Sequence, residues 1–220
     1  MKQLVDWHRF WQQERLGFHE GRVNRYLQRH LASFDIKPGD MVFMPLCGKA
    51  VDILWLAQQG YHVVGVELSE IAVRSFFDEA GIHCEEKSTG DFTVFSANGI
   101  TLYQGDYMHL RAEHLLDCRL VYDRASLVAI EAFNRLSYAQ HMLSIIPART
   151  PMLLITLEYD QQKVSGPPFS VPLGEIAELY AAHYRIEVVE SHEQVDERPK
   201  WRAAGLESMQ ESALRLVTAA

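Results

Sequence analysis

The segment 41–70 constrains the fold of this chain more than any other stretch, because it contains a complete strand–loop–helix–strand unit. A short apolar run at 41–44 predicts a buried parallel strand, and a tight loop follows it. An amphipathic helix is expected over 51–59, and a second buried strand over 62–66, which ends at the acidic Glu67. A strand, a glycine turn, a helix and an acid about twenty residues further on are typical of α/β proteins that bind an adenosine.

The loop 45–49 contains a single glycine, Gly48, where a dinucleotide-binding loop has three. The second glycine of that pattern lets the backbone approach a pyrophosphate, so its absence favours a nucleoside ligand without one. S-adenosylmethionine (SAM) is such a ligand, and the Glu67 carboxylate would accept hydrogen bonds from its ribose hydroxyls. The spacing alone also fits a plain strand–helix–strand unit that ends in an acid by chance.

The composition favours small molecules as the main partners. The chain has 220 residues, enough for one large domain or two small ones, and a net charge of −8, which argues against nucleic acid and anionic membranes. Three dispersed cysteines, Cys47, Cys84 and Cys118, argue against a disulfide framework and for a reducing compartment. No apolar run approaches the roughly 20 residues that span a bilayer. The N-terminus does not resemble a signal peptide, so we expect a cytoplasmic protein. No long apolar stripe is left over, so we expect a monomer.

Strand and helix signals alternate along the rest of the chain, which predicts a mostly parallel sheet with helices on both faces. The expected helices are 4–14, 19–30, 69–80, 133–146 and 173–183, and the expected strands are 92–95, 100–103, 119–122, 152–157 and 185–189. Asn98-Gly99 between two strands is a strong hairpin signal. The segment 206–217 fits either a long strand or a helix, and a late strand can enter antiparallel at or near an edge.

Polar and small residues follow several of the predicted strands. Ligands of open α/β sheets bind outside the carboxyl ends of the strands, where the strand order reverses. This rule places five residues on one rim: Leu46, Gly48, Glu67, Asp106 and Arg124.

Six motifs occur in order along the chain, namely Phe10-Trp11, Gly17-Phe18-His19, Pro45-Leu46-Cys47-Gly48-Lys49, Gly65-Val66-Glu67-Leu68-Ser69, Tyr122 to Ile130, and Gly166 to Pro172. Together they resemble the thiopurine S-methyltransferase family in its shorter bacterial form, over nearly the whole chain. The resemblance implies a class I methyltransferase fold that binds SAM. This Rossmann-like α/β fold has a mostly parallel sheet of seven strands with one antiparallel strand and helices on both faces.

The family resemblance also implies a single domain over 1–220, with an N-terminal helical cover at 1–35 and an α/β core at 40–220. The implied reaction is methyl transfer from SAM, which leaves S-adenosylhomocysteine, to the sulfur of aromatic or heterocyclic thiols such as thiopurines. Bacterial members are also associated with the methylation of selenium or tellurium compounds.

Site residues can be carried over from the family motifs. The implied SAM contacts are Trp7, Trp11, Leu46, Glu67, Asp106, Tyr107 and Arg124, with Gly48 in the cofactor loop. Phe18 matches an aromatic residue on the substrate side. A basic residue near the C-terminus faces the substrate in the family, and both Arg198 and Arg202 fit, because the sequence departs from the family pattern there.

The residue types support this chemistry but leave alternatives open. Arg124 could stabilise an anionic acceptor, or it could form a rim salt bridge with Asp123 or a neighbouring acid. Trp7 and Trp11 could cover a sulfonium through cation–π attraction, or they could be core residues. The stiff loop that contains Phe169 is expected to limit acceptor size, although it could be only a rigid connection.

Other reactive side chains fit structural roles better. Cys47 has no adjacent base in the sequence and is expected to be a small buried residue rather than a nucleophile. His19 is read as a helix-start histidine in preference to a general base. The ten histidines and three cysteines show no metal-ligand spacing, so no metal site is expected.

Three other functions share part of this pattern. A nicotinamide-dependent oxidoreductase would use the same strand–loop–helix–acid unit, but the single loop glycine argues against it. A SAM-binding module without catalysis would not need an acceptor side with aromatic residues and an arginine. A methyltransferase for oxygen or nitrogen acceptors would generally need a positioned base, which the sequence does not reveal.

Overall fold

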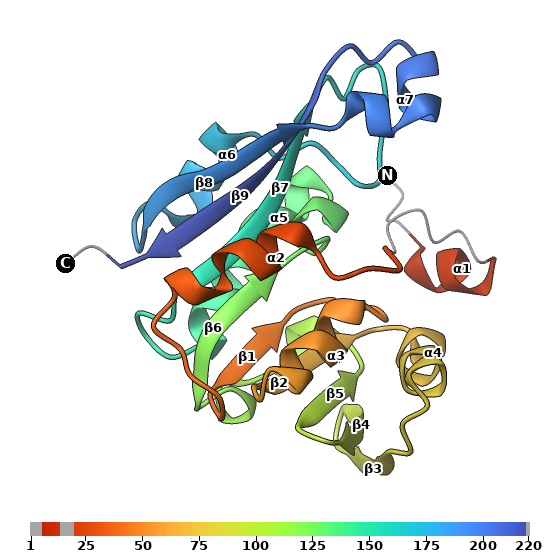
Figure 1. Cartoon of the computed structure of the whole chain (residues 1–220), viewed down its shortest axis with the longest axis vertical. Coiled ribbons are helices and arrows are strands. Elements are labelled where there is room, and N and C mark those ends of the chain that lie inside the picture. Colours follow the sequence, from red (N-terminus) through yellow and green to blue (C-terminus); the bar gives the residue numbers. More distant parts are fainter. Residues whose placement is uncertain (1–5, 14–19, 219–220) are drawn as a thin grey trace.

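The computed structural model describes residues 6–13 and 20–218, and these residues form a sheet with helices on both faces (Figure 1). The strands are β1 Met41–Met44, β2 His62–Glu67, β3 Glu85–Thr89, β4 Phe92–Ala97, β5 Ile100–Gln104, β6 Cys118–Asp123, β7 Met152–Tyr159, β8 Arg185–Glu193 and β9 Met209–Val217. Their order across the sheet is β3-β4-β5-β2-β1-β6-β7-β9-β8. The predicted α/β class is confirmed.

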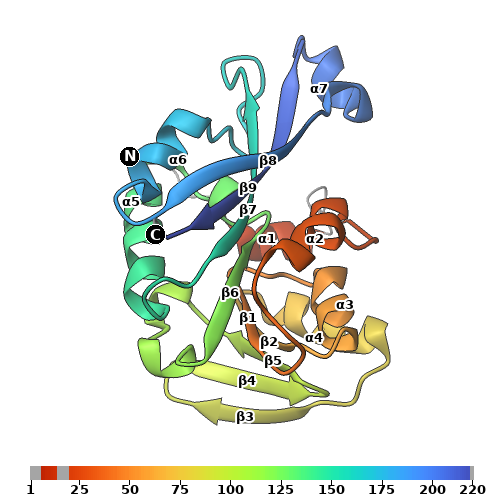
Figure 2. The same ribbon diagram turned by 60° about the vertical axis from the view of Figure 1, so that its left-hand side comes forward.

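Seven of the strands have the directions that the family resemblance implies, with one antiparallel strand among parallel ones. Strands β5, β2, β1, β6 and β7 run parallel, and β9 enters antiparallel between β7 and β8. Strand β4 pairs antiparallel with both β5 and β3. Strands β3 and β4 therefore extend the sheet from the expected seven strands to nine among the described residues. Figure 2 shows β3 and β4 at one end of the sheet and β8 at the other.

Helices cover both faces of the sheet. They are α1 Trp7–Gln12, α2 Arg25–His30, α3 Val51–Gln58, α4 Glu70–Ala80, α5 Ala132–Ile145, α6 Leu173–Tyr180 and α7 Pro199–Ala203. Successive residues of a strand face opposite sides, so β1 contributes Val42 and Met44 to one core and Phe43 to the other. Helices α2, α3 and α4 pack in the first core, and α5 and α6 in the second. Burial on both faces explains why the central strands are continuously apolar.

The Asn98-Gly99 turn joins β4 to β5 as the sequence predicts. The φ angles are 51° at Asn98 and 79° at Gly99, so both central residues are left-handed, as a type I′ turn requires. The pairing of Ala97 with Ile100 closes the hairpin directly at the turn.

Strand β3 was not predicted from the sequence. All of its residues are exposed, and the run Glu85-Glu86-Lys87-Ser88-Thr89 has no apolar alternation. It forms because β4 offers it an edge to pair with. Its charged side chains suit an outermost strand, which must not attract further strands.

The predicted helix over 19–30 is wrong for residues 20–24, which precede α2 without helical structure. The Asn24 side chain accepts hydrogen bonds from backbone N–H groups in the first turn of α2, as an N-cap residue does. The backbone N–H of Asn24 donates to Asp52 at 2.7 Å. This tertiary bond ties the non-helical segment to the first turn of α3.

The final segment, for which strand and helix both fitted the sequence, is the strand β9. It is buried along most of its length because β7 and β8 flank it. Within the described ranges, every helix is too short or too polar to cross a bilayer.

Candidate active site

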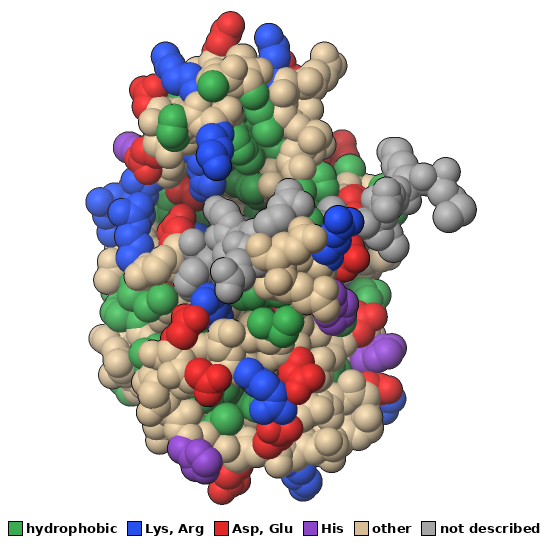
Figure 3. Space-filling model, turned by 90° about the vertical axis from the view of Figure 1, so that its right-hand side faces the viewer, with side chains coloured by type: hydrophobic (Ala, Val, Ile, Leu, Met, Phe, Trp, Pro, Cys, Tyr) green, Lys and Arg blue, Asp and Glu red, His purple; other side chains and the backbone are tan. Residues whose placement is uncertain are grey.

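A cavity of about 880 Å³ lies where β1, β2, β5 and β6 end, at the carboxyl edge of the parallel strands. Its volume is in the range that holds small ligands and cofactors. All five residues that the sequence places on one rim line it: Leu46, Gly48, Glu67, Asp106 and Arg124. Figure 3 shows the face of the molecule on which the cavity lies. Hydrophobic side chains gather there in a hollow, below the upper end of the molecule that carries α7.

Left-handed backbone shapes the loop that follows β1. The φ angles are 44° at Leu46 and 53° at Gly48. Glycine adopts this conformation without strain. A Cβ at position 48 would lie 3.2 Å from the ring of Trp11, so the missing side chain also leaves room for the indole. Gly48 thus serves both the loop conformation and the close approach of α1.

The carboxylate of Glu67 is buried beside this loop. It accepts hydrogen bonds from the backbone N–H groups of Gly48 at 2.9 Å and Ser69 at 2.7 Å. Burial raises the pKa of Glu67 to about 6, although these hydrogen bonds to backbone N–H groups oppose the shift. Each oxygen keeps a further lone pair, so Glu67 can still accept from hydroxyls in the cavity.

The loop after β5 supplies Asp106 and Tyr107 to the cavity wall. Asp106 accepts a hydrogen bond from the backbone N–H of Met108 and so caps a short 3-10 turn. The ring of Tyr107 is buried 4.9 Å from the ring of Tyr138 on α5, and its hydroxyl donates to the Tyr138 carbonyl. The wall at this end is therefore held by contacts between the loop and α5.

Arg124 follows β6 and also lines the cavity. Its guanidinium Nη2 lies 3.0 Å from Oε1 of Glu20, in the segment before α2. The two alternatives for Arg124 are thus not exclusive, since it pairs with an acid and still forms part of the wall. The next residue, Ala125, is left-handed with φ 61°, and Ser126 donates to the Pro45 carbonyl at 2.6 Å. The turn that carries Arg124 is thereby fastened to the loop after β1.

Asp123 is not the partner of Arg124. It is 1% exposed and accepts hydrogen bonds from the Leu127 backbone N–H at 3.1 Å and the Tyr138 hydroxyl at 2.7 Å. Burial raises the pKa of Asp123 to about 6. The carboxyl group connects the end of β6 to α5 and thereby supports the turn that carries Arg124.

The helix α1 brings aromatic rings to the cavity. Trp7, Phe10 and Trp11 line it, and Trp11 is the buried residue of this helix. The predicted pair Trp7 and Trp11 is therefore brought to the same site as Glu67. The predicted substrate residue Phe18 lies outside the described residues.

The wall opposite the cofactor loop comes from the C-terminal third of the chain. Arg198, Lys200 and Trp201 line it, together with Pro167 and Pro168. The Arg198 guanidinium lies 5.8 Å from the Trp201 ring, within the range of a cation–π contact. This wall combines flat apolar surface with positive charge.

The structure distinguishes the two candidate arginines. Arg202 is exposed, pairs with Asp196 and is not among the residues that line the cavity, whereas Arg198 is. Phe169 is also not a lining residue, although its neighbours Pro167 and Pro168 are. The Phe169 backbone N–H donates to the Val128 carbonyl at 2.6 Å, which fixes the path of this loop.

Several lining residues were not found from the sequence. They come from α5, α7 and the turn before α5, and they include Ile130, Asn134, Ser137, Tyr138, Lys200 and Trp201. Trp201, between two cations in the run Lys200-Trp201-Arg202, carried a usable signal. The α5 residues carried none, because a helix that lines a cavity has the same pattern as one that packs in a core.

Cys47 lies in the cofactor loop and lines the cavity, but it is buried. Burial, together with the negative charge of Glu67, raises the pKa of its thiol well above the usual value. A thiol held in its neutral form is a poor nucleophile, which agrees with a structural role.

The strand order with β9 reversed, the glycine loop after β1 and the acid that ends β2 define a class I SAM-dependent methyltransferase fold. The family model described as thiopurine S-methyltransferase (TPMT) matches residues 2–219. The chain belongs to the thiopurine S-methyltransferase family and is a SAM-dependent S-methyltransferase.

Individual relatives agree with this family. The thiopurine S-methyltransferase of Pseudomonas aeruginosa is 45% identical over 184 residues, which is 84% of each chain. That of Nitrosospira multiformis is 40% identical over 212 residues, which is 96% of each chain. In fold, the protein is similar to the SAM-dependent methyltransferase from Geobacter sulfurreducens in complex with S-adenosyl-L-homocysteine, with a TM-score of 0.62, 11% identity, and coverage of 98% of this chain and 99% of the other.

Proposed function

We propose that this protein transfers the methyl group of SAM to the sulfur of an aromatic or heterocyclic thiol. One observation carries the proposal: a single cavity joins the hydrogen-bonded pair Gly48 and Glu67 at one end to a wall of proline, tryptophan and arginine at the other. A cofactor held at the first end would present its methyl group to an acceptor at the second. Thiopurines are heterocyclic thiols of the required shape.

The residues at the first end fit the cofactor in its charges and its shape. Leu46, Gly48 and the Trp11 ring that lies against Gly48 all line this end, so a thioether or sulfonium chain would pass along them. Glu67 would accept from the ribose hydroxyls, and Asp106 and Tyr107 would border the adenine. Arg124 would meet the cofactor's carboxylate, the one anionic group of the ligand.

The tryptophans of α1 fit a cationic group. When bound, SAM supplies a methyl group on a positively charged sulfur, and that charge is lost on transfer. The indole of Trp11 lies against Gly48, and Trp7 lines the same cavity. An aromatic face near a cation contributes about 0.5–2 kcal/mol, so these rings would favour the charged cofactor over the neutral product.

The second end fits a flat acceptor that carries partial or full negative charge. Pro167, Pro168 and Trp201 offer flat apolar surface, and Arg198 stabilises a thiolate or thione sulfur by its charge. A sulfur nucleophile needs alignment more than proton transfer. We therefore assign Arg198 to the acceptor and Phe169 to the support of Pro167 and Pro168.

The test is to incubate the purified protein with SAM and 6-mercaptopurine and to detect the S-methyl product by mass spectrometry. Product that is lost in Glu67→Ala and Arg124→Ala, but kept in Glu86→Ala, would support the proposal, since Glu86 is exposed and pairs with Arg74, which does not line the cavity. If no thiol is methylated while S-adenosylhomocysteine still binds, the thiol assignment is wrong. Selenite and tellurite would then be the next acceptors.

A further inference from the structure

We propose that Glu20 is a positioning residue of this enzyme: it holds the guanidinium of Arg124 in the orientation that receives the carboxylate of the cofactor's methionine part. The inference rests on the proposed function, because it assumes that SAM occupies the cavity. It assigns a role to a residue that no motif of the sequence marks.

The contact is direct. Oε1 of Glu20 lies 3.0 Å from Nη2 of Arg124, and the Arg124 side chain is 11% exposed. Among residues 6–13 and 20–218, no other carboxylate lies within 4.0 Å of this guanidinium. A guanidinium has five N–H donors in a planar fork. Glu20 engages one nitrogen and Arg124 lines the cavity, so the remaining donors can serve a ligand there.

The strand order places Arg124 at the methionine end of the cofactor. Glu67 ends β2 and Arg124 follows β6, with β1 and its glycine loop between them. Neighbouring strands lie about 4.8 Å apart, so the two side chains start roughly 10 Å from each other. A SAM molecule whose ribose meets Glu67 extends over the loop by about this length, which brings its amino-acid part to Arg124.

One buried carboxylate holds both partners of the ion pair in place. Asp52 is 2% exposed and accepts hydrogen bonds from the Asn24 backbone N–H at 2.7 Å and the Tyr122 hydroxyl at 3.1 Å. Asn24 lies four residues after Glu20, and Tyr122 lies two residues before Arg124. The segment 20–24 is thus fixed against the end of β6, which Arg124 follows.

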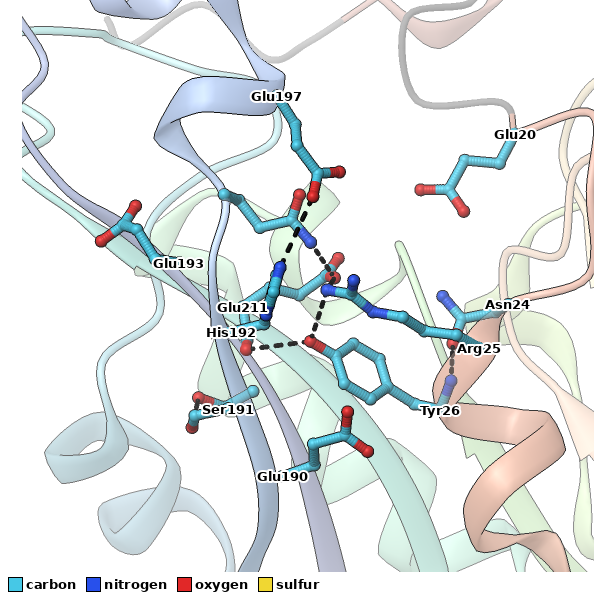
Figure 4. A network of polar contacts seen from close by, with 12 residues as sticks. Glu20, Asn24, Arg25, Tyr26, Glu190, Ser191, His192, Glu193, Glu197 and Glu211 are labelled. Atoms are coloured by element: carbon cyan, nitrogen blue, oxygen red, sulfur yellow. Dashed lines mark hydrogen bonds and ion pairs between the residues drawn. The ribbon is translucent and has the colours of Figure 1, made fainter.

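The surrounding charges favour a firmly held arginine. Burial by itself would lower the pKa of Arg124, but the nearby Tyr122, Glu20 and Asp52 raise it above its usual value. The other nearby acids are engaged elsewhere: Asp52 accepts from Asn24 and Tyr122, and Arg25 and Gln194 bind the carboxylate of Glu211 (Figure 4). Figure 4 also shows Glu20 apart from these contacts, above Arg25 in this view. Glu20 is therefore the acid that can set the direction of Arg124.

The experiment compares two probes by isothermal titration calorimetry with the full-length protein. S-adenosylhomocysteine carries the amino-acid part, and 5′-methylthioadenosine lacks it. In Glu20→Gln, we expect the Kd of S-adenosylhomocysteine to rise about tenfold, while the Kd of 5′-methylthioadenosine stays the same. Glu20→Asp should recover part of the loss, because it restores the charge. Glu86→Gln is the matched control, since Glu86 pairs with Arg74 on exposed surface and should change neither Kd.

Two results would overturn the inference. Unchanged or tighter S-adenosylhomocysteine binding in Glu20→Gln would show that Glu20 is neutral or competes for Arg124. Equal losses for both probes would show a general structural effect. In an Arg124→Met background, Glu20→Gln should give no further loss if it acts through the arginine. A wild-type protein that binds neither probe would instead contradict the proposed cofactor site itself.

Discussion

The backbone N–H of Gly48 donates a hydrogen bond to Oε2 of Glu67 at 2.9 Å, so the loop after β1 is tied directly to the end of β2. The second carboxylate oxygen accepts from the backbone N–H of Ser69, the N-cap of α4. One buried side chain therefore fixes three segments that meet at the cavity. Changes here are expected to affect cofactor binding more than global stability.

Gly48→Ala should weaken S-adenosylhomocysteine binding at least tenfold. The new methyl group meets Trp11 at 3.2 Å, and the backbone has φ 53°, so the loop or the indole must move. Left-handed backbone costs a non-glycine residue about 1–2 kcal/mol. The matched control is Gly81→Ala, with φ 65° and nothing within 4 Å of the added atom. Calorimetry and thermal unfolding should show similar stability losses, but a binding loss only for position 48.

Trp11→Ala should weaken SAM binding strongly and lower the melting temperature only slightly. Trp11 is the buried residue of α1, whose other described residues are exposed or half-buried, so little of the core depends on it. The loss should be larger for SAM than for S-adenosylhomocysteine, because only SAM carries the sulfonium charge that an indole attracts. Equal losses for the two ligands would remove the cation–π assignment.

The matched variant for this test is Trp55→Ala. Trp55 packs against the core beneath α3 and does not line the cavity. It should lower the melting temperature more than Trp11→Ala does, and leave the SAM affinity unchanged. If the two variants change the melting temperature and the SAM affinity to the same extent, Trp11 is an ordinary core residue.

Asp123→Asn should change the stability of the protein in a way that depends on pH. Relative to wild type, the variant should be more stable at neutral pH than it is at pH 4. The pKa of this buried carboxyl is about 6 in the folded protein and near 3.8 in an unfolded chain, so the folded state binds the proton more tightly. The stability that depends on this proton is lost as the pH rises through this window. The advantage of the variant over wild type should grow by an amount on the order of 3 kcal/mol between pH 4 and pH 7. Urea unfolding at several pH values measures it.

Glu193→Gln should show the opposite dependence. Desolvation would raise the pKa of Glu193, but hydrogen bonds from the Ser208 hydroxyl and the Met209 backbone N–H, among others, lower it to about 2. The ionised carboxylate then stabilises the fold above pH 4.5, and this contribution is lost as the pH falls toward 2. The variant should be less stable than wild type at neutral pH, with a difference that shrinks in acid. The same sign for both variants would contradict these assignments.

Arg198→Ala should raise the KM for a thiol acceptor severalfold and leave S-adenosylhomocysteine binding unchanged. Arg198 lines the cavity beside Trp201, and the proposed function assigns its positive charge to the acceptor sulfur. Arg202→Ala is the control, because Arg202 lies on exposed surface paired with Asp196. Steady-state kinetics with 6-mercaptopurine measures both, and a larger effect at position 202 would reverse the assignment.

Short local patterns in the sequence predicted many of the residues of the candidate site. The run from β1 to β2 shows its strand, loop, helix and acid within a single segment, so the placement of Gly48 and Glu67 on the cavity follows from the sequence. The Asn98-Gly99 turn is equally local, since two residues determine its type. The mostly parallel sheet came from the alternation of strand and helix signals, and the count of seven strands came from the family resemblance. Strand β3 was missed because its pairing, not its composition, makes it a strand.

Other parts of the site depend on residues that are distant along the chain. Arg198 and Arg202 are equivalent in the sequence, and only the packing of α7 separates the cavity wall from the exposed face. Phe169 was expected in the wall, but the path of its loop presents Pro167 and Pro168 there. Neither result has a local signal, because both depend on the direction in which a short segment meets the sheet.

The sequence by itself determined the α/β class, the cofactor loop and the acid at the end of β2, because these follow from periodicity and spacing over short stretches of chain. The tertiary structure alone decided that Arg124 pairs with Glu20 and not with Asp123, its neighbour in sequence. A strand end fixes where the chain turns, but the direction of a charged side chain depends on which distant groups compensate its burial. That balance exists only after the segment before α2, β6 and α5 have packed together.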